Sequence, residues 1–121
     1  MSPPLISIID DDESMRLALA GLLRSLGLRS DTHASVEDFL QSTAQGETDC
    51  IITDIQMPGL SGIDLKRSLD SRGNHTPVIM ITGRPEGQLH CEAMASGIVC
   101  LLKKPFSSDA LLACLRAARL F

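Results

Sequence analysis

Residues 50–62 read CIITDIQMPGLSG, and this stretch contains the pattern on which the fold prediction rests. Its first residues, Cys50–Thr53, form a short apolar run rich in β-branched side chains that stops at an acid, Asp54. Such a run is typical of a strand that is buried on both faces of a sheet. The proline and glycines that follow predict a turn-rich loop after this strand.

Comparable runs lie on both sides of this stretch. The sequence predicts further strands at 5–9, 29–33, 78–81 and 99–102. The run at 29–33 is polar, so it suits only the edge of a sheet. Apolar residues at helical spacing predict the intervening helices, over 15–26, 36–40, 65–69, 89–94 and 111–118.

Strand and helix therefore alternate five times along the chain. This order predicts an α/β fold with one parallel sheet and helices on both of its faces. Because crossover connections are right-handed, five strands fit the flavodoxin-like, doubly wound order 2-1-3-4-5. No linker, internal repeat or low-complexity stretch is visible, so we expect residues 1–121 to form one domain.

The composition narrows the classes of function. The chain carries 11 Lys and Arg against 15 Asp and Glu, a formal net charge of −4, without a basic run. This balance argues against direct nucleic-acid binding by this segment. No apolar run approaches the roughly 20 residues that span a bilayer, and no signal peptide precedes the first strand. We therefore expect a cytoplasmic protein without a membrane segment.

The four cysteines give little sign of a shared role. They lie in mostly apolar stretches without C-x-x-C spacing, at positions Cys50, Cys91, Cys100 and Cys114. Paired ligand spacing is missing, which argues against a zinc site and against a disulfide framework. We expect reduced, mostly buried thiols, as in cytoplasmic proteins.

Acids, a threonine and a lysine follow the predicted strands. They are Asp10, Asp11 and Asp12 after the first strand, Asp54 after the third, Thr82 after the fourth and Lys104 after the fifth. In a doubly wound sheet, ligands bind outside the carboxyl ends of the strands, so these side chains should meet in one crevice. Converging acids repel one another. Mg²⁺ would relieve that repulsion, because it takes oxygen ligands from one or two carboxylates, waters and a phosphate.

The same residues suit phosphoryl transfer to a carboxylate. A carboxylate can attack phosphorus and form an aspartyl phosphate. Asp54 is the candidate nucleophile, because it precedes a turn-rich loop and helix capping explains it poorly. A lysine ammonium and a threonine hydroxyl would stabilise the phosphoryl oxygens. For Asp12, a helix N-cap and a part in the site remain equally open.

The strand ends also carry a family resemblance. The segments IIDDDESMR at 8–16 and ITDIQMPGLSG at 52–62, with Ile81-Thr82-Gly83 and Lys104-Pro105-Phe106, resemble the signatures of bacterial response-regulator receiver domains. The resemblance covers essentially the whole chain in the right order and spacing. It is nearest to regulators of the nitrogen-fixation type, which usually precede a helix-turn-helix transcription domain.

The resemblance implies a role for each acid. Asp54 would be the phosphoacceptor. Mg²⁺ would be held by Asp10, Asp11, Asp54 and the backbone carbonyl of Gln56, with Asp11 as the more direct ligand of the acidic pair and Asp10 acting largely through water. Gln56 and Arg84 occupy positions that tune the lifetime of the phosphoryl group in this family.

The resemblance also implies how the domain would switch. Thr82 would be the hydroxyl that moves to bond the phosphoryl group, and Lys104 the ion-pairing lysine. A cis peptide bond before Pro105 would aim Lys104 inward. One position departs from the family: Leu101 stands where an aromatic residue usually turns inward on activation. Signal propagation through that position is therefore expected to differ.

The resemblance further implies partners. The phosphodonor would be a sensor histidine kinase, and the output would be regulation of transcription by an effector domain. A homodimer would form through the face made by the fourth helix, fifth strand and fifth helix. Such a domain promotes its own phosphorylation and dephosphorylation and is not a conventional enzyme.

Three alternatives compete with this interpretation. A haloacid-dehalogenase-type phosphohydrolase would use Asp10 and Asp12 as its D-x-D pair, but it needs an acidic cluster after the lysine, where only Asp109 lies. A flavodoxin-like FMN module would need a phosphate loop and aromatics, whereas the first loop is acidic and Trp and Tyr are absent. A degenerate receiver that only binds proteins is kept open by Leu101.

Overall fold

Parallel strands form one five-stranded sheet in the order β2-β1-β3-β4-β5. The structure is a computed structural model that describes residues 3–83 and 87–120, except for the side chains of residues 44 and 45. The strands are β1 (Leu5–Ile9), β2 (Arg29–His33), β3 (Cys50–Asp54), β4 (Val78–Thr82) and β5 (Cys100–Lys103). Every predicted strand is present to within one residue at each end, and the predicted order is confirmed.

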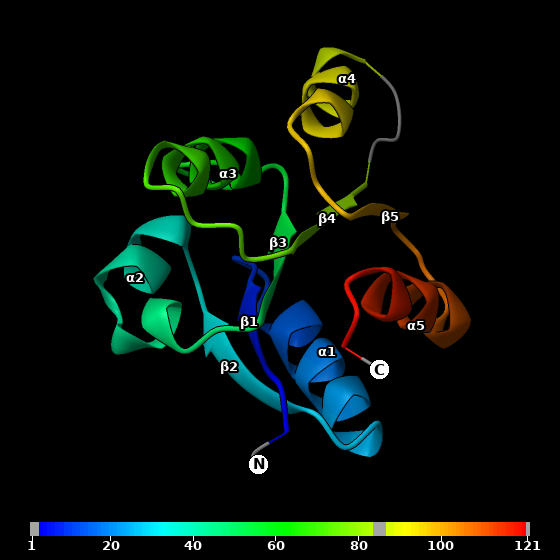
Figure 1. The fold of residues 1–121 in the computed structure, drawn as a ribbon. Helices are drawn as coiled ribbons and strands as arrows, with labels where there is room; N and C mark the ends of the chain where they lie inside the picture. Colours follow the sequence, from blue (N-terminus) through cyan, green and yellow to red (C-terminus); the bar gives the residue numbers. More distant parts are fainter. Residues whose placement is uncertain (1–2, 84–86, 121) are drawn as a thin grey trace.

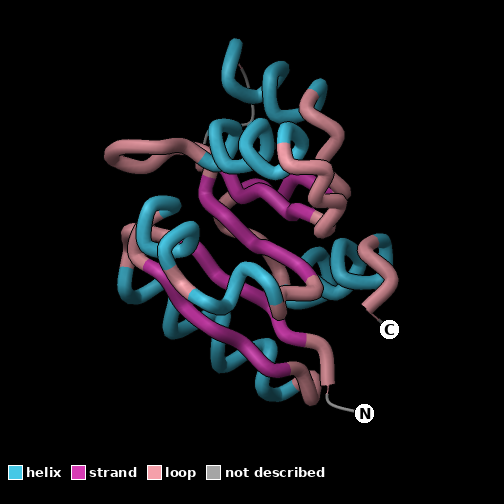
Figure 2. The backbone as a smooth tube through the Cα atoms, turned by 60° about the vertical axis from the view of Figure 1, so that its left-hand side comes forward, coloured by secondary structure: helices cyan, strands magenta, loops and turns pink. Residues whose placement is uncertain are grey.

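Helices cover both faces of this sheet (Figure 1). They are α1 (Glu13–Ser25), α2 (Val36–Gln41), α3 (Gly62–Ser71), α4 (Gln88–Ala95) and α5 (Ser108–Ala117), with a short 3₁₀ turn, η1 (Thr43–Gly46), after α2. Figure 1 shows α1 and α5 on one face and α2, α3 and α4 on the other. The tube in Figure 2 shows the strands running as a twisted layer between the helices. The predicted α/β doubly wound fold is confirmed.

Two hydrophobic clusters fill the space between the sheet and the helices. Alternate strand residues such as Ile6, Ile52 and Ile79 pack against α1 and α5. Their neighbours, such as Ile51 and Met80, pack against α2, α3 and α4. Because successive side chains of a strand point to opposite faces, a strand between two helix layers must be mostly apolar. This is why β1, β3 and β4 are buried along their whole length, whereas edge strand β2 is polar.

Side-chain caps fix where the helices begin. Asp12 is the N-cap of α1 and accepts hydrogen bonds from the backbone N–H groups of Ser14 and Met15. Capping therefore accounts for Asp12, the residue that the sequence left open. Ser107 caps α5 by accepting a hydrogen bond from the backbone N–H of Ala110.

The α4 region differs from the expected packing. Of the three apolar residues that predicted this helix, only Ala93 is buried, while Leu89 and Met94 are 39% and 57% exposed. The helix is short and stands beside β4 and β5 at the edge of the sheet, where little sheet surface remains to be covered (Figure 1).

The expectation of reduced, mostly buried thiols is wrong for Cys100 and Cys114, which are oxidised, while Cys91 is reduced but exposed. Cys100 on β5 and Cys114 on α5 form a disulfide with a Cα–Cα distance of 5.6 Å, and Cys91 is an exposed free thiol. The pairing depends on α5 folding back over β5, which the 14-residue separation does not reveal. Only Cys50 fits the expectation, and burial raises the pKa of its thiol to about 12.

None of the helices in the described part of the chain combines the length and apolar character of a membrane span.

Candidate functional site

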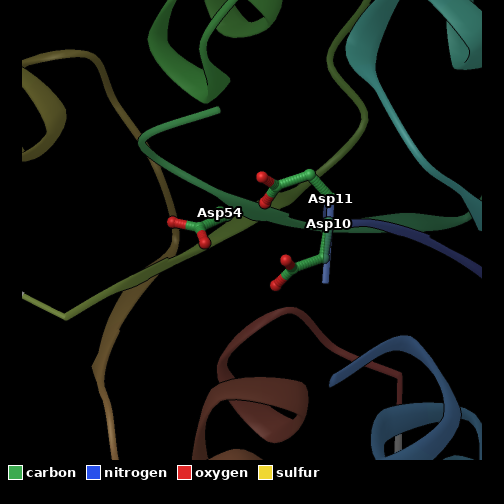
Figure 3. A group of neighbouring side chains, drawn as sticks. All are labelled: Asp10, Asp11 and Asp54. Carbon is green, nitrogen blue, oxygen red and sulfur yellow. The ribbon is translucent and has the colours of Figure 1, made fainter. Parts of the chain in front are cut away.

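Three carboxylates converge where β1 and β3 end. The two strands are paired in parallel, with Ile9 opposite Thr53, so Asp10 and Asp54 follow at adjacent strand ends. Asp10, Asp11 and Asp54 each offer one carboxylate oxygen, and these oxygens all lie within 4.8 Å of one another. Figure 3 shows the three side chains extending toward the same side of the strand ends. The expected convergence of these acids is therefore present.

Asp10 is the most strongly confined of the three acids. Its side chain is 1% exposed, and its Oδ2 atom has no hydrogen-bond partner among the described residues. Burial raises the pKa of Asp10, and the charges of Asp54 and Asp11 add to this, while the backbone N–H of Asp12 and the charge of Lys104 oppose it. A buried carboxylate oxygen without a donor, beside two further carboxylates, suits a hard cation.

Lys104 supplies positive charge next to both Asp54 and Asp10. Its Nζ atom donates to Asp54 Oδ2 at 2.9 Å and lies 3.7 Å from Asp10 Oδ2. The bond between Lys104 and Pro105 is cis, as expected, and the Lys104 backbone N–H donates to the Thr82 carbonyl at 2.7 Å. Burial lowers the pKa of the Lys104 ammonium, but the hydrogen bond and charge of Asp54, with that of Asp10, outweigh it and raise the pKa. Lys104 is therefore a cation in the site at neutral pH.

A cavity of about 470 Å³ opens beside Asp54. Thr82, at the end of β4, lies on its wall with Asp54, Gln56 and Lys104, and its side chain is buried. Leu89 at the start of α4 also lines the cavity. The cavity thus brings the predicted nucleophile, hydroxyl and ammonium to one open space, with room for a phosphoryl group and part of its donor.

The loop after β3 is held tightly to the strand that it leaves. The Gln56 N–H donates to Asp54 Oδ1 at 3.3 Å, and the Gly62 N–H donates to the Ile55 carbonyl at 3.1 Å. A Cβ atom on Gly62 would lie 2.6 Å from the Asp54 carbonyl oxygen, closer than a side chain can approach backbone. Gly62 therefore allows α3 to start directly against the phosphoacceptor candidate, a role hidden from the sequence because it depends on this close approach.

Arg16 is a second residue that sequence reasoning missed. Its guanidinium donates to the backbone carbonyl of Asp10 at 2.6 Å and so fixes the end of β1 from α1. Arg16 belongs to the family-like segment 8–16, which was a signal that it has a role. Its contact with the Asp10 carbonyl could not be predicted, because it depends on how the first turn of α1 packs over the end of β1. Arg84 lies outside the described residues. Leu101, which replaces the usual aromatic, is half-buried and packs against the cluster that contains Met80.

Comparisons with known proteins agree with this geometry. A sequence profile described as "Response regulator receiver domain" matches residues 6–116. The transcriptional regulatory protein FixJ of Azorhizobium caulinodans is 42% identical over 113 residues, which are 93% of this chain and 54% of that protein. Nodulation protein W of Bradyrhizobium diazoefficiens is 39% identical over 114 residues, which are 94% of this chain and 50% of that protein. The chain thus spans about half the length of these curated relatives.

Solved structures resemble the fold equally closely. The crystal structure of FixJ-N superposes with a TM-score of 0.86 at 32% identity, covering 98% of this chain and 94% of that one. Profile, relatives and structure all match the segment that contains the three clustered acids and Lys104. The chain therefore belongs to the response-regulator receiver domains of two-component systems.

Proposed function

We propose that this domain is a Mg²⁺-dependent switch that accepts a phosphoryl group on Asp54. One observation carries the proposal: the Asp54 carboxylate borders the 470 Å³ cavity, contacts the Lys104 ammonium at 2.9 Å, and lies in the cluster with Asp10 and Asp11. A carboxylate in this setting is open to an incoming donor and is surrounded by groups that stabilise phosphoryl charge.

The acidic cluster would hold the metal ion. Carboxylate oxygens of Asp10, Asp11 and Asp54 lie within 4.8 Å of one another. Together with the backbone carbonyl of Gln56, they would form an all-oxygen donor set of the kind that Mg²⁺ prefers. The Oδ2 atom of Asp10 accepts no hydrogen bond from the described residues and has only the Lys104 ammonium 3.7 Å away, which supports a further cation at this place. When bound, Mg²⁺ supplies positive charge against the phosphoryl oxygens.

The chain's own residues would carry out the transfer. A carboxylate oxygen of Asp54 attacks phosphorus, so an O–P bond forms while the bond from phosphorus to the donor breaks and the donor keeps its electron pair. The donor bond is P–N in a phosphohistidine and P–O in acetyl phosphate. Lys104 neutralises charge on the phosphoryl oxygens, and the Thr82 hydroxyl donates a hydrogen bond to one of them.

Family membership supports a proposal about the whole protein's setting. We propose that the phosphodonor is a sensor histidine kinase in the cytoplasm and that residues 1–121 form the receiver domain. The FixJ relative is named as a transcriptional regulatory protein, which supports regulation of transcription as the output, through a region other than this acidic segment. The exposed side chains of Leu89, Met94 and Val99 on α4 and before β5 support dimerisation through the α4–β5–α5 face.

Labelling with a small phosphodonor tests the proposal. The purified chain with acetyl phosphate and Mg²⁺ should gain one phosphoryl group, seen as a single mass increase that is stable in acid and lost in base. Asp54→Asn should remove the increase, because the neutral amide is a far weaker nucleophile. Chelation of Mg²⁺ should suppress labelling of the unaltered chain. Steady turnover of a phosphomonoester would instead support the phosphohydrolase alternative.

A further inference from the structure

The loop between β3 and α3, residues 55–61, carries Gln56, whose backbone carbonyl belongs to the proposed metal site. Hydrogen bonds fix both ends of this loop: Gln56 N–H to Asp54 Oδ1 at the start, and Gly62 N–H to the Ile55 carbonyl at the end. Ser61 also forms a capping box with Asp64 at the start of α3. Between these ends, Met57 packs against the hydrophobic cluster that contains Met80, and the tip of the loop at Gly59 and Leu60 has a further contact.

That contact comes from α2. The Leu60 backbone N–H donates to Glu37 Oε1 at 3.3 Å. The other oxygen, Oε2, lies so close to Gly59 that a Cβ atom there would overlap it. Gly59 also has a φ of +81°, which glycine adopts at little cost. One carboxylate therefore lies against two successive residues at the tip of the loop, and the missing side chain of Gly59 makes this approach feasible.

We infer that Glu37 is a positioning residue for the metal site, acting through the loop that carries Gln56. This inference rests on the proposed function. A hydrogen bond from a neutral N–H to a carboxylate is stronger than one to a neutral acceptor, although exposure to water weakens it here. Groups that orient metal ligands without touching the metal commonly change metal affinity, because the loop otherwise has to be ordered when the metal binds.

The chain offers a matched control for Glu37. Asp38 is the next residue of α2, is also acidic and exposed, and also lies in the first turn of the helix. Within the described part of the chain, the backbone N–H of Asp38 donates to the Ser35 hydroxyl oxygen that caps the helix, and no hydrogen bond joins the Asp38 carboxylate to the loop. Replacing Asp38 removes the same charge from the same helix and leaves the loop contact in place.

The test compares three variants of the whole chain: Glu37→Ala, Glu37→Gln and Asp38→Ala. Isothermal titration with Mg²⁺ should give roughly three- to tenfold weaker binding for Glu37→Ala, less than the 10–100-fold typical of a group bonded directly to a ligand. Glu37→Gln should stay within about twofold of the unaltered chain, because its amide oxygen still accepts from Leu60. Asp38→Ala should also stay within about twofold, since it removes only a surface charge.

Two further readouts separate positioning from a general loss of stability. In metal-free buffer, the Leu60 amide should exchange its hydrogen faster in Glu37→Ala than in Asp38→Ala, while amides in β3 keep their protection. Labelling by acetyl phosphate should slow in Glu37→Ala at low Mg²⁺ and recover at saturating Mg²⁺. A defect that persists at saturating Mg²⁺ would contradict an effect exerted through metal affinity.

The outcomes distinguish this inference from the function on which it rests. Equal Mg²⁺ affinity in Glu37→Ala and Asp38→Ala, with normal binding and labelling of the unaltered chain, would overturn the role of Glu37 and leave the proposed function standing. An unaltered chain that neither binds Mg²⁺ nor becomes labelled on Asp54 would overturn the proposed function, and the role of Glu37 with it.

Discussion

The centre of the sheet and its β5 edge are built in different ways. β1, β3 and β4 are buried along their whole length, and Asp10, Asp54 and Thr82 lie at their ends. The β5 edge is only partly covered, with exposed apolar side chains on α4 and a disulfide that ties β5 to α5. The difference teaches that the chemistry is placed on the best-packed part of the fold, while the surface that would pass on a signal is loosely packed.

Truncation of one side chain in each region should show this contrast most strongly. Ile52 on β3 is fully buried, so Ile52→Ala should lower the free energy of unfolding by about 2–5 kcal/mol. Met94→Ala on exposed α4 should change it by about 0.5 kcal/mol or less. Chemical denaturation of both variants measures the two values. Similar losses would mean that α4 is packed as firmly as the central strands.

The disulfide should account for much of the stability at the β5 edge. Closing a loop of this length stabilises a fold by about 3 kcal/mol in the chain-entropy account. Reduction should therefore lower the unfolding free energy, and Cys100→Ser should remove the response to reductant. Cys91→Ser, at an exposed free thiol, is the matched control and should keep that response. Two reactive thiols at 100 and 114 in the unreduced chain would contradict the cross-link.

Metal binding should stabilise the centre of the sheet. Mg²⁺ at 100 times its dissociation constant should add about 2.7 kcal/mol to the unfolding free energy by mass action. Asp11 is exposed, so Asp11→Ala should leave the metal-free fold nearly unchanged while weakening the response to Mg²⁺ sharply. Melting curves with and without Mg²⁺ provide the comparison. An undiminished response in Asp11→Ala would remove that residue from the site.

The smallest expected effect concerns pH in the absence of metal. Because the pKa of Asp10 is raised in the folded state, the folded chain binds that proton more tightly than the unfolded chain. The contribution of Asp10 to stability should then fall as the pH rises from its ordinary value of 3.8 through the raised pKa. Asp10→Asn, which keeps an acceptor for the Asp12 N–H, should be more stable than the unaltered chain at neutral pH and lose this advantage in acid. An Asp10 carboxyl that titrates normally by NMR would contradict this.

The same contrast explains what the sequence could predict. Strands that are buried on both faces appear in the sequence as continuous apolar runs, and the acids that follow these runs mark the strand ends. The strand order and the clustering of Asp10, Asp11 and Asp54 could therefore be predicted from the sequence. The Cys100–Cys114 bond depends on how α5 packs over β5, which no local pattern encodes. The exposure of the apolar side chains on α4 could not be predicted for a similar reason. Helical spacing of apolar residues predicts a helix but does not indicate how much sheet surface is left for that helix to cover.

Close approaches of backbone were hidden as well. The sequence marked Gly59 and Gly62 only as turn residues. In the structure, Gly59 gives room to the Glu37 carboxylate and Gly62 gives room to the Asp54 carbonyl oxygen. Both roles depend on elements that are distant in the sequence or separated by a loop. A glycine in a turn is consistent with many such contacts, so its partner has to be found in three dimensions.

The location of the phosphoryl label tests the central claim most directly. The chain should be labelled with acetyl phosphate and Mg²⁺, trapped with borohydride, digested and mapped by mass spectrometry. We predict a single modified residue, Asp54, and no label in Asp54→Asn, whose near-isosteric side chain should leave the fold intact. A label on Asp10 that persists in Asp54→Asn would contradict the account and support the phosphohydrolase alternative.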